Sequence, residues 1–291
     1  MNDTAATRAR EGRIATAAAA LASRAHEGPT ALLSMTDEQL LVLSGRDPNS
    51  ALVTPWVDAH AQSEQDHDLL LRSTARAMLA GGQVSTESTL AALEERDPMG
   101  EPSDLLPVPV VAGVLGRRGY SQLRVTATDL DASERGALQQ FADSDGTVML
   151  EQISANGIHH FTMCTREAAI ELASPWIFGQ LPTPGEGSPL PVSEDSDTPE
   201  VVTGRYEQLR TDSPLADILQ DAERRIAFLA EDRRARTTQV MWVITAGTEH
   251  IAVQPADETL DPEALEEVSL EALRVSRAGI TAQLSDFLTV A

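Results

Sequence analysis

Apolar residues recur at helical spacing along much of this 291-residue chain. An Ala-rich stretch predicts a first helix over residues 3–25, which Gly28 and Pro29 end. Thr36, Ser63 and either Ser85 or Thr86 stand just before apolar-periodic runs and are suitable N-caps. Further helices are therefore predicted over 37–44, 64–80, 86–96 and 110–117. The helix of 64–80 is expected to bury one face, formed by Leu70, Leu71, Ala75, Met78 and Leu79. In the helix of 86–96, Leu90 and Leu93 are expected to point inward.

Strand patterns follow from about residue 120. The strongest local signal is Asn156-Gly157, flanked by the apolar-rich runs 148–153 and 158–163. Asn-Gly suits a two-residue type I′ turn, in which both residues need positive φ, so a hairpin is predicted here. A second hairpin is predicted from 240–245 and 249–253 around Gly247. Residues 120–128 favour a strand, and 135–143 favour a strand with a helix as the alternative.

Helical spacing returns on both sides of these hairpins. A helix is predicted after Thr165, closed by Pro175, and others over 201–210, 213–231 and 269–288. The helix of 213–231 would carry one apolar stripe, formed by Leu215, Ile218, Leu219, Ala222, Ile226 and Leu229. The last helix would place Leu270, Leu273, Ile280, Leu284 and Phe287 on one face.

The two predicted hairpins suggest an internal repeat. Val148-Met149-Leu150 and Val240-Met241-Trp242 open them about 92 residues apart. The fold class predicted is α+β, with two pseudo-symmetric halves, each with helices packed on a mainly antiparallel β-sheet containing a hairpin; the alternative is two unrelated hairpins. The predicted parts are an N-terminal helix (1–30), a first half (31–179), an acidic linker or loop rich in Pro, Gly and Ser (180–200) and a second half (201–291).

Charge narrows the classes of function. The chain has 45 acidic and 22 basic residues, all of the latter Arg, for a net charge of −23. This balance disfavours binding to nucleic acid or to an anionic membrane surface. Cys164 is the only cysteine, which excludes an intrachain disulfide and favours the cytoplasm. No run of 18 apolar residues is present, so no membrane insertion is expected.

Four parts of the sequence carry candidate chemistry. Six potential ligands cluster in 58–68 (Asp58, His60, Glu64, Asp66, His67 and Asp68), but acids after the Ser63 cap also suit a helix dipole, so no metal site is predicted. His159 and His160 are neighbours in a strand and point to opposite faces. Cys164 is interpreted as a core residue, and 113–119 as a helix end, not a phosphate loop. We therefore predict no enzyme and no cofactor.

Five arginines over 224–236 form the main basic cluster (Arg224, Arg225, Arg233, Arg234 and Arg236). They would suit an acidic partner. The favoured interpretation is that they complement the acids of 255–271 within the chain, or form a solvated face.

The order of elements resembles one family. An Arg-Ser-Thr-Ala-Arg-Ala-Met-Leu-Ala-Gly-Gly stretch (72–82) leads to a short helix, then to a Pro/Val/Leu run (107–115) and to the hairpin of 148–162. This resembles the EspG-type proteins of actinobacterial ESX (type VII) secretion systems. The resemblance implies an α/β protein with pseudo-two-fold symmetry that acts as a cytosolic chaperone for secreted pairs of helical proteins.

Such a chaperone would offer an apolar face to a helical partner. The candidate partner-binding residues are Trp242 in the second hairpin and Ile280, Leu284 and Phe287 in the last helix, with burial in the core as the alternative. The competing function is a transcriptional regulator or scaffold with a winged-helix-like N-terminal unit over 64–96. Its second helix offers three Glu against Arg96 alone, which counts against DNA. The oligomeric state stays open.

Overall fold

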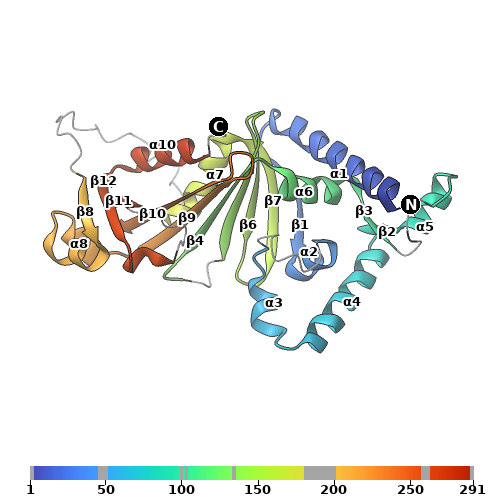
Figure 1. Ribbon diagram of the computed structural model, residues 1–291, viewed down its shortest axis with the longest axis horizontal. Coiled ribbons are helices and arrows are strands. Elements are labelled where there is room, and N and C mark those ends of the chain that lie inside the picture. The colour runs from blue at the N-terminus through green and yellow to red at the C-terminus, as the bar shows by residue number, and fades with distance from the viewer. Residues whose placement is uncertain are drawn as a thin grey trace, which may run out of the picture. The chain divides into compact units, whose positions relative to one another are not determined.

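The chain is α+β, as predicted, with helices and antiparallel strands throughout (Figure 1). The computed structural model describes residues 3–44, 52–98, 101, 104–132, 136–179, 201–256 and 263–288. Contacts divide the chain into two compact units. Unit 1 is formed by residues 1–121 and 145–165, and unit 2 by 122–144 and 166–291. The predicted pseudo-symmetry of two halves stays a prediction, and the 180–200 segment lies outside the described residues.

Unit 1 contains three antiparallel strands in the order β1-β7-β6. Their bounds are Thr30–Thr36 for β1, Thr147–Ile153 for β6 and Ile158–Thr165 for β7. The predicted hairpin of β6 and β7 is confirmed, whereas β1 carried no strand prediction. One apolar side chain of β1, Met35, is fully buried, and the rest of the strand is half-buried or exposed. Its edge position explains why its alternation is weak in the sequence.

The turn of this hairpin differs from the predicted type I′ geometry. The amide N of Ser154 donates to the Ile158 carbonyl (2.9 Å), which leaves a three-residue loop, 155–157. Only Gly157 has positive φ (72°), and Asn156 does not. A three-residue loop needs one left-handed residue at its end, and glycine provides it without a steric cost. The Ser154 hydroxyl also accepts from the Ile158 amide (3.1 Å) and so adds a second hydrogen bond across the same pair of residues.

Two helices of unit 1 cross at close range. They are α1 (Asp3–Ala25) and α6 (Pro109–Tyr120), both near their predicted bounds. A Cβ added at Gly113 would lie 2.9 Å from the Ala17 carbonyl oxygen, and one at Gly116 would lie 2.9 Å from Ile14 Cγ2. Gly113 and Gly116 therefore allow the helices to approach each other, as small residues do at helix contacts. This segment is helix to Tyr120, and the strand predicted from residue 120 begins at Leu123.

The remaining elements of unit 1 are short apart from one helix. They are α2 (Asp37–Ser44), α3 (Pro55–His60), α4 (Glu64–Ala80), β2 (Val84–Thr86), α5 (Glu87–Leu93) and β3 (Leu105–Pro107). The predicted caps are confirmed. Ser63 accepts from the Asp66 amide (3.1 Å) and Thr86 from the Thr89 amide (3.2 Å). Thr36 and Gln39 form a reciprocal capping box at the start of α2.

Unit 2 contains seven antiparallel strands in the order β5-β4-β9-β10-β11-β12-β8. Their bounds are Leu123–Asp129 (β4), Ala137–Ala142 (β5), Val202–Arg205 (β8), Arg224–Asp232 (β9), Thr237–Ala246 (β10), Glu249–Pro255 (β11) and Ser269–Val275 (β12). The predicted hairpin around Gly247 is confirmed as β10–β11. Its helices are α7 (Arg166–Phe178), α8 (Tyr206–Asp212), α9 (Ala216–Gln220) and α10 (Arg277–Phe287), with a 3-10 turn η3 (Ala264–Glu266).

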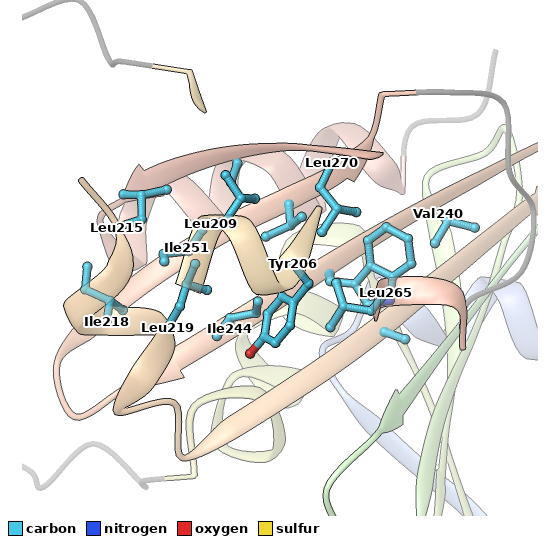
Figure 2. Close-up of a cluster of buried hydrophobic side chains, with 14 residues drawn as sticks. Tyr206, Leu209, Leu215, Ile218, Leu219, Val240, Ile244, Ile251, Leu265 and Leu270 are labelled. Atoms are coloured by element: carbon cyan, nitrogen blue, oxygen red, sulfur yellow. The ribbon is translucent and has the colours of Figure 1, made fainter. Parts of the chain in front are cut away.

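Helices line both faces of this sheet. On one face, Leu209 of α8 and Ile218 of α9 pack against Ile244 and Ile251 from the central strands (Figure 2). On the other face, Ile170 of α7 and Leu284 of α10 line the same small space as side chains of β4, β5 and β9. Alternate residues of the central strands therefore enter two separate apolar layers.

Three helix predictions in unit 2 are wrong in part. In the stretch 201–210, residues 202–205 form strand β8, which pairs with β12, and helix α8 begins only at Tyr206. The stretch 213–231 is the short helix α9 followed by strand β9, which is hydrogen-bonded to β4 on one side and to β10 on the other. Both of its faces are covered, so Ile226, Ala227 and Phe228 are all buried, and such a strand lacks the alternation that distinguishes it from a helix.

The stretch 269–288 is strand β12 followed by helix α10. Leu270 and Ala272 are fully buried on one face of β12, whereas Leu273 is half-buried. Ser276 accepts from the Gly279 amide (3.1 Å) and begins the helix there. Pro175 does not close α7 either, because the helix continues to Phe178. No described helix is long and apolar enough to span a membrane.

Candidate functional site

Helix α4 carries two exposed leucines, Leu69 and Leu79. Its start is fixed by the Ser63 cap, and its end by the Gly81 amide, which donates to the Ala77 carbonyl (2.8 Å). One face packs toward α2, with Met78 fully buried and Leu70, Leu71 and Ala75 partly buried. The predicted stripe is confirmed for these residues. Leu79 is 38 % exposed and lies outside it, because it falls about 100° from Met78 around the helix.

The opposite face of α4 is a row of two leucines and two arginines. Leu69, Arg72, Arg76 and Leu79 follow one another at spacings of three, four and three residues, which keeps them on one side of the helix. Leu69 is 67 % exposed, and the Arg72 side chain is 81 % exposed. We call these four residues the outer face of α4.

Arginines of the outer face are only weakly engaged. Arg72 Nη2 lies 3.6 Å from Asp68 Oδ2, and both side chains are largely exposed. Such an i,i+4 pair in water contributes little to stability. Arg76 is exposed and has no ion-pair partner within the described ranges. The outer face therefore presents positive charge between two leucines on a strongly acidic chain.

Unit 1 also buries a chain of four charged side chains. His159 on β7 has Nε2 2.7 Å from Asp37 Oδ1 and Nδ1 2.5 Å from Glu151 Oε1. Arg118 Nη1 on α6 lies 2.5 Å from the same Glu151 oxygen. Asp37, Glu151 and His159 are fully buried, and Arg118 is 7 % exposed. We call these four residues the buried charge chain.

The buried charge chain joins distant parts of unit 1. Asp37 is the first residue of α2, and its Oδ2 accepts from the backbone amides of Trp56 (2.8 Å) and Val57 (3.1 Å) in α3. The Asp37 amide donates to the Gly157 carbonyl in the hairpin loop (3.0 Å). The carboxylate of Asp37 therefore connects the start of α2 to α3 and to His159 on β7, and its backbone amide connects α2 to the β6–β7 loop.

Two carboxylates favour the charged form of His159. Burial acts most strongly and lowers the pKa of His159, but hydrogen bonds to Asp37 and Glu151 together outweigh it, so this pKa is raised above 6.5. An imidazolium donates from both ring nitrogens, which matches the two carboxylate contacts. With Arg118 the four formal charges balance. Glu151 Oε2 has no hydrogen-bond partner in the described part of the chain.

The chemistry of the buried charge chain suits a structural role, the stabilisation of the fold of unit 1. All its members are buried and so shielded from a substrate in solvent. Cys164, the neighbouring candidate, donates weakly to the Val148 carbonyl (3.6 Å), and burial raises the pKa of its thiol to about 12. A thiol in this state is a poor nucleophile, as the interpretation as a core residue requires.

Two hollows are found among the described residues of unit 2. One is an apolar space of about 10 Å³ between the sheet and α7 and α10, with room for about one water molecule. The other is an open groove of about 660 Å³, where Asp217, Asp221 and Glu223 face the Glu249–Arg274 ion pair.

The predicted partner-binding residues lie in the interior of unit 2. Trp242 and Ile280 are fully buried, Leu284 is 6 % exposed, and Phe287 is partly buried beside it. This placement is the core alternative that the sequence left open. By contrast, Leu93, expected to point inward from α5, is 75 % exposed. Arg96, which a DNA reader would expose, pairs with Glu87 and Glu94 (2.6 and 2.5 Å).

The other sequence candidates are placed separately. His60 Nδ1 lies 2.7 Å from the Trp56 carbonyl, whereas Asp66 binds the Ser63 cap, so the ligands of 58–68 do not converge. His159 and His160 do point to opposite faces, one buried and one exposed. Arg225 binds Asp131 (2.6 Å) and, from the acidic run after 255, Glu266 (2.9 Å).

Arg224 is a strand residue that holds a helix end. Its Nε donates to Asp129 Oδ2 (2.7 Å), and its Nη1 donates to the carbonyls of Trp176 and Ile177 in the last turn of α7. An arginine at free helix carbonyls stabilises the C-terminus of the helix.

No protein-family model matches the chain, and no curated protein matches it significantly. Its function therefore has to be argued from the residues described above. Sequence reasoning missed both features of unit 1. The spacing 69, 72, 76 and 79 was available as a signal for the outer face, but the pairing of Asp37 with His159 spans 122 residues and has no local signal.

Proposed function

We propose that this chain is a non-enzymatic protein-binding protein of the cytoplasm. The observation that carries the proposal is the outer face of α4, where Leu69 and Leu79 remain exposed on a helix whose other face is packed. Isolated exposed leucines are common, but two in register with two arginines form a binding surface of the kind that amphipathic helices recognise.

The best specific candidate is a chaperone for helical substrates of a type VII secretion system. The stretches that carry the resemblance to EspG-type proteins fall on α4, on β3 and α6, and on the β6–β7 hairpin. A transcriptional regulator is the weaker alternative, because Arg96 of α5 is held in ion pairs with two glutamates. The acidic chain also repels nucleic acid.

Co-expression tests this proposal. The full chain would be produced together with each secreted helical pair encoded at a type VII secretion locus of its own genome. Size-exclusion chromatography with light scattering should then show a stoichiometric complex with one of the pairs. Failure to form a complex with any pair, or retention on sequence-specific DNA at moderate salt, would overturn the chaperone proposal.

A further inference from the structure

We infer that the outer face of α4 docks an acidic amphipathic helix of a partner protein. The inference deepens the proposed function by naming the surface and the chemistry of the partner segment. It rests on four side chains, Leu69, Arg72, Arg76 and Leu79. Leu69 and Leu79 are ten residues apart, which corresponds to about 15 Å along the helix axis.

The length and shape of the row favour a helix as the occupant. About 15 Å is nearly three helical turns, so a partner helix of three or four turns covers it end to end. Side chains at spacings of three and four residues form a ridge, and ridges of one helix pack into the grooves of another. A partner helix with leucines at matching spacings would then place them beside Leu69 and Leu79.

Charge selects which helix binds. Arg72 and Arg76 lie between the two leucines, on a chain whose net charge is −23. An acidic segment is repelled by most of this surface and attracted at the two arginines, so the charges set both the site and the register of binding. The Asp68–Arg72 contact of 3.6 Å is exposed and is easily given up to a partner carboxylate.

Other occupants fit this surface less well. Two leucines are too narrow a stripe for a lipid surface, and the acids that open α4, Glu64 and Asp66, disfavour phosphate. A second copy of this chain is the remaining alternative, and the test below includes it.

Two synthetic peptides of about 18 residues serve as probes. Both place leucines at spacings of three and four residues; one carries glutamates between them, and the other carries lysines at the same positions. Fluorescence anisotropy with the full-length protein should show that the glutamate peptide binds at least about tenfold more tightly than the lysine peptide at low salt. The preference should shrink at about 500 mM salt.

A charge reversal on α4 supplies the decisive comparison. Arg72→Glu/Arg76→Glu should invert the preference, so that the lysine peptide binds more tightly. Arg10→Glu/Arg24→Glu is the matched control, because it reverses two exposed arginines of α1 in the same unit and changes the net charge equally. Leu69→Ser should weaken the glutamate peptide about tenfold, whereas Val201→Ser, at an exposed position of unit 2, should not.

With the protein and the peptides alone, any of three results would overturn the inference: equal binding of both peptides, equal effects of the α4 and α1 reversals, or a wild-type dimer that Arg72→Glu/Arg76→Glu converts to a monomer. The last would assign the face to a second copy. Circular dichroism confirms that each variant is folded. A stoichiometric complex with a secreted pair that survives Arg72→Glu/Arg76→Glu would overturn this inference and leave the proposed function intact.

Discussion

Two buried histidines, one in each unit, occupy opposite electrostatic surroundings. His159 of unit 1 has a carboxylate at each ring nitrogen. His250 of unit 2 lies against the Phe178 ring, with ring centroids 5.2 Å apart, and its Nδ1 has no hydrogen-bond partner in the described ranges. Both are strand residues with little exposure, so burial alone does not decide their charge.

The pKa values of the two histidines move in opposite directions. Carboxylates at both nitrogens outweigh burial and raise the pKa of His159. Burial, followed by the positive charge of Arg277, lowers the pKa of His250, and Glu249 only partly opposes this. The contrast teaches that a buried histidine stabilises a fold through its charge in one place and through its neutrality in another.

The largest loss of stability is expected when Glu151, one of the two carboxylates beside His159, is removed. Glu151→Ala would leave Arg118 and His159 buried with one carboxylate fewer, so unit 1 should lose about 3–5 kcal/mol of unfolding free energy. Hydrogen exchange of the β6 and β7 amides, with urea unfolding, measures the loss. The matched control is Glu249→Ala, which removes an exposed partner of Arg274 and should cost less than about 1 kcal/mol. Equal losses in the two variants would contradict a structural role for the buried charge chain.

A smaller loss of stability is expected from a substitution at Gly157, where the β6–β7 loop contacts Asp37. Gly157 has φ of 72°, and an added Cβ would lie 2.8 Å from Asp37 Cγ and 2.6 Å from Trp56 Cβ. Gly157→Ala should therefore cost about 2–4 kcal/mol, of which about 1–2 kcal/mol comes from the left-handed backbone. Urea unfolding measures both this variant and its control.

Gly146→Ala separates backbone strain from crowding. Gly146 has φ of 78° in the same unit, but nothing lies within 4 Å of an added Cβ. Its substitution should cost only the backbone share, about 1–2 kcal/mol. If the two alanine variants are equally stable, the loop does not hold Asp37 in place.

The pH dependence of unit 1 is the next effect in size. The folded pKa of His159 is raised above 6.5, so its contribution is complete below about pH 6.5 and is lost as pH rises through the folded pKa. One proton changes stability by at most about 1.4 kcal/mol per pH unit. Urea unfolding of the wild type and of His159→Asn, at pH values from 6 upward, should show a difference that shrinks with rising pH. A constant difference would mean that His159 is buried neutral.

Much of the fold was predictable from local signals. The caps at Ser63, Thr86 and Thr36 and both hairpins follow from chemistry within a few residues of each other. Strand β9 and strand β12 were missed because central or half-covered strands place apolar residues at spacings that also fit a helix. Both stretches are strands because the sheet supplies hydrogen-bonding partners, which are β4 and β10 for β9 and β11 for β12.

The candidate sites were less predictable, for two reasons. Leucines lie on both sides of α4, so spacing alone does not tell which face is packed and which is exposed. The buried charge chain combines Asp37, Arg118, Glu151 and His159 from four elements, and only the tertiary fold brings them together. Trp242, by contrast, was predicted to contact a partner because the hairpin around it is apolar. The same apolar neighbours bury it in unit 2.

The smallest expected effect is the pH response of unit 2, which has the opposite sign. The folded pKa of His250 lies below 6.5, so unit 2 is at full stability above about pH 6.5 and loses it as pH falls toward the folded pKa. The slope is bounded by the same one-proton limit, and the loss is confined to pH values below about 6.5. Imidazole titration by NMR should place the midpoint of His250 below that of His159. His250→Phe, which keeps a ring against Phe178, should remove the acid-side loss from hydrogen exchange of β10 and β11. If that loss persists, another group in unit 2 takes up the proton.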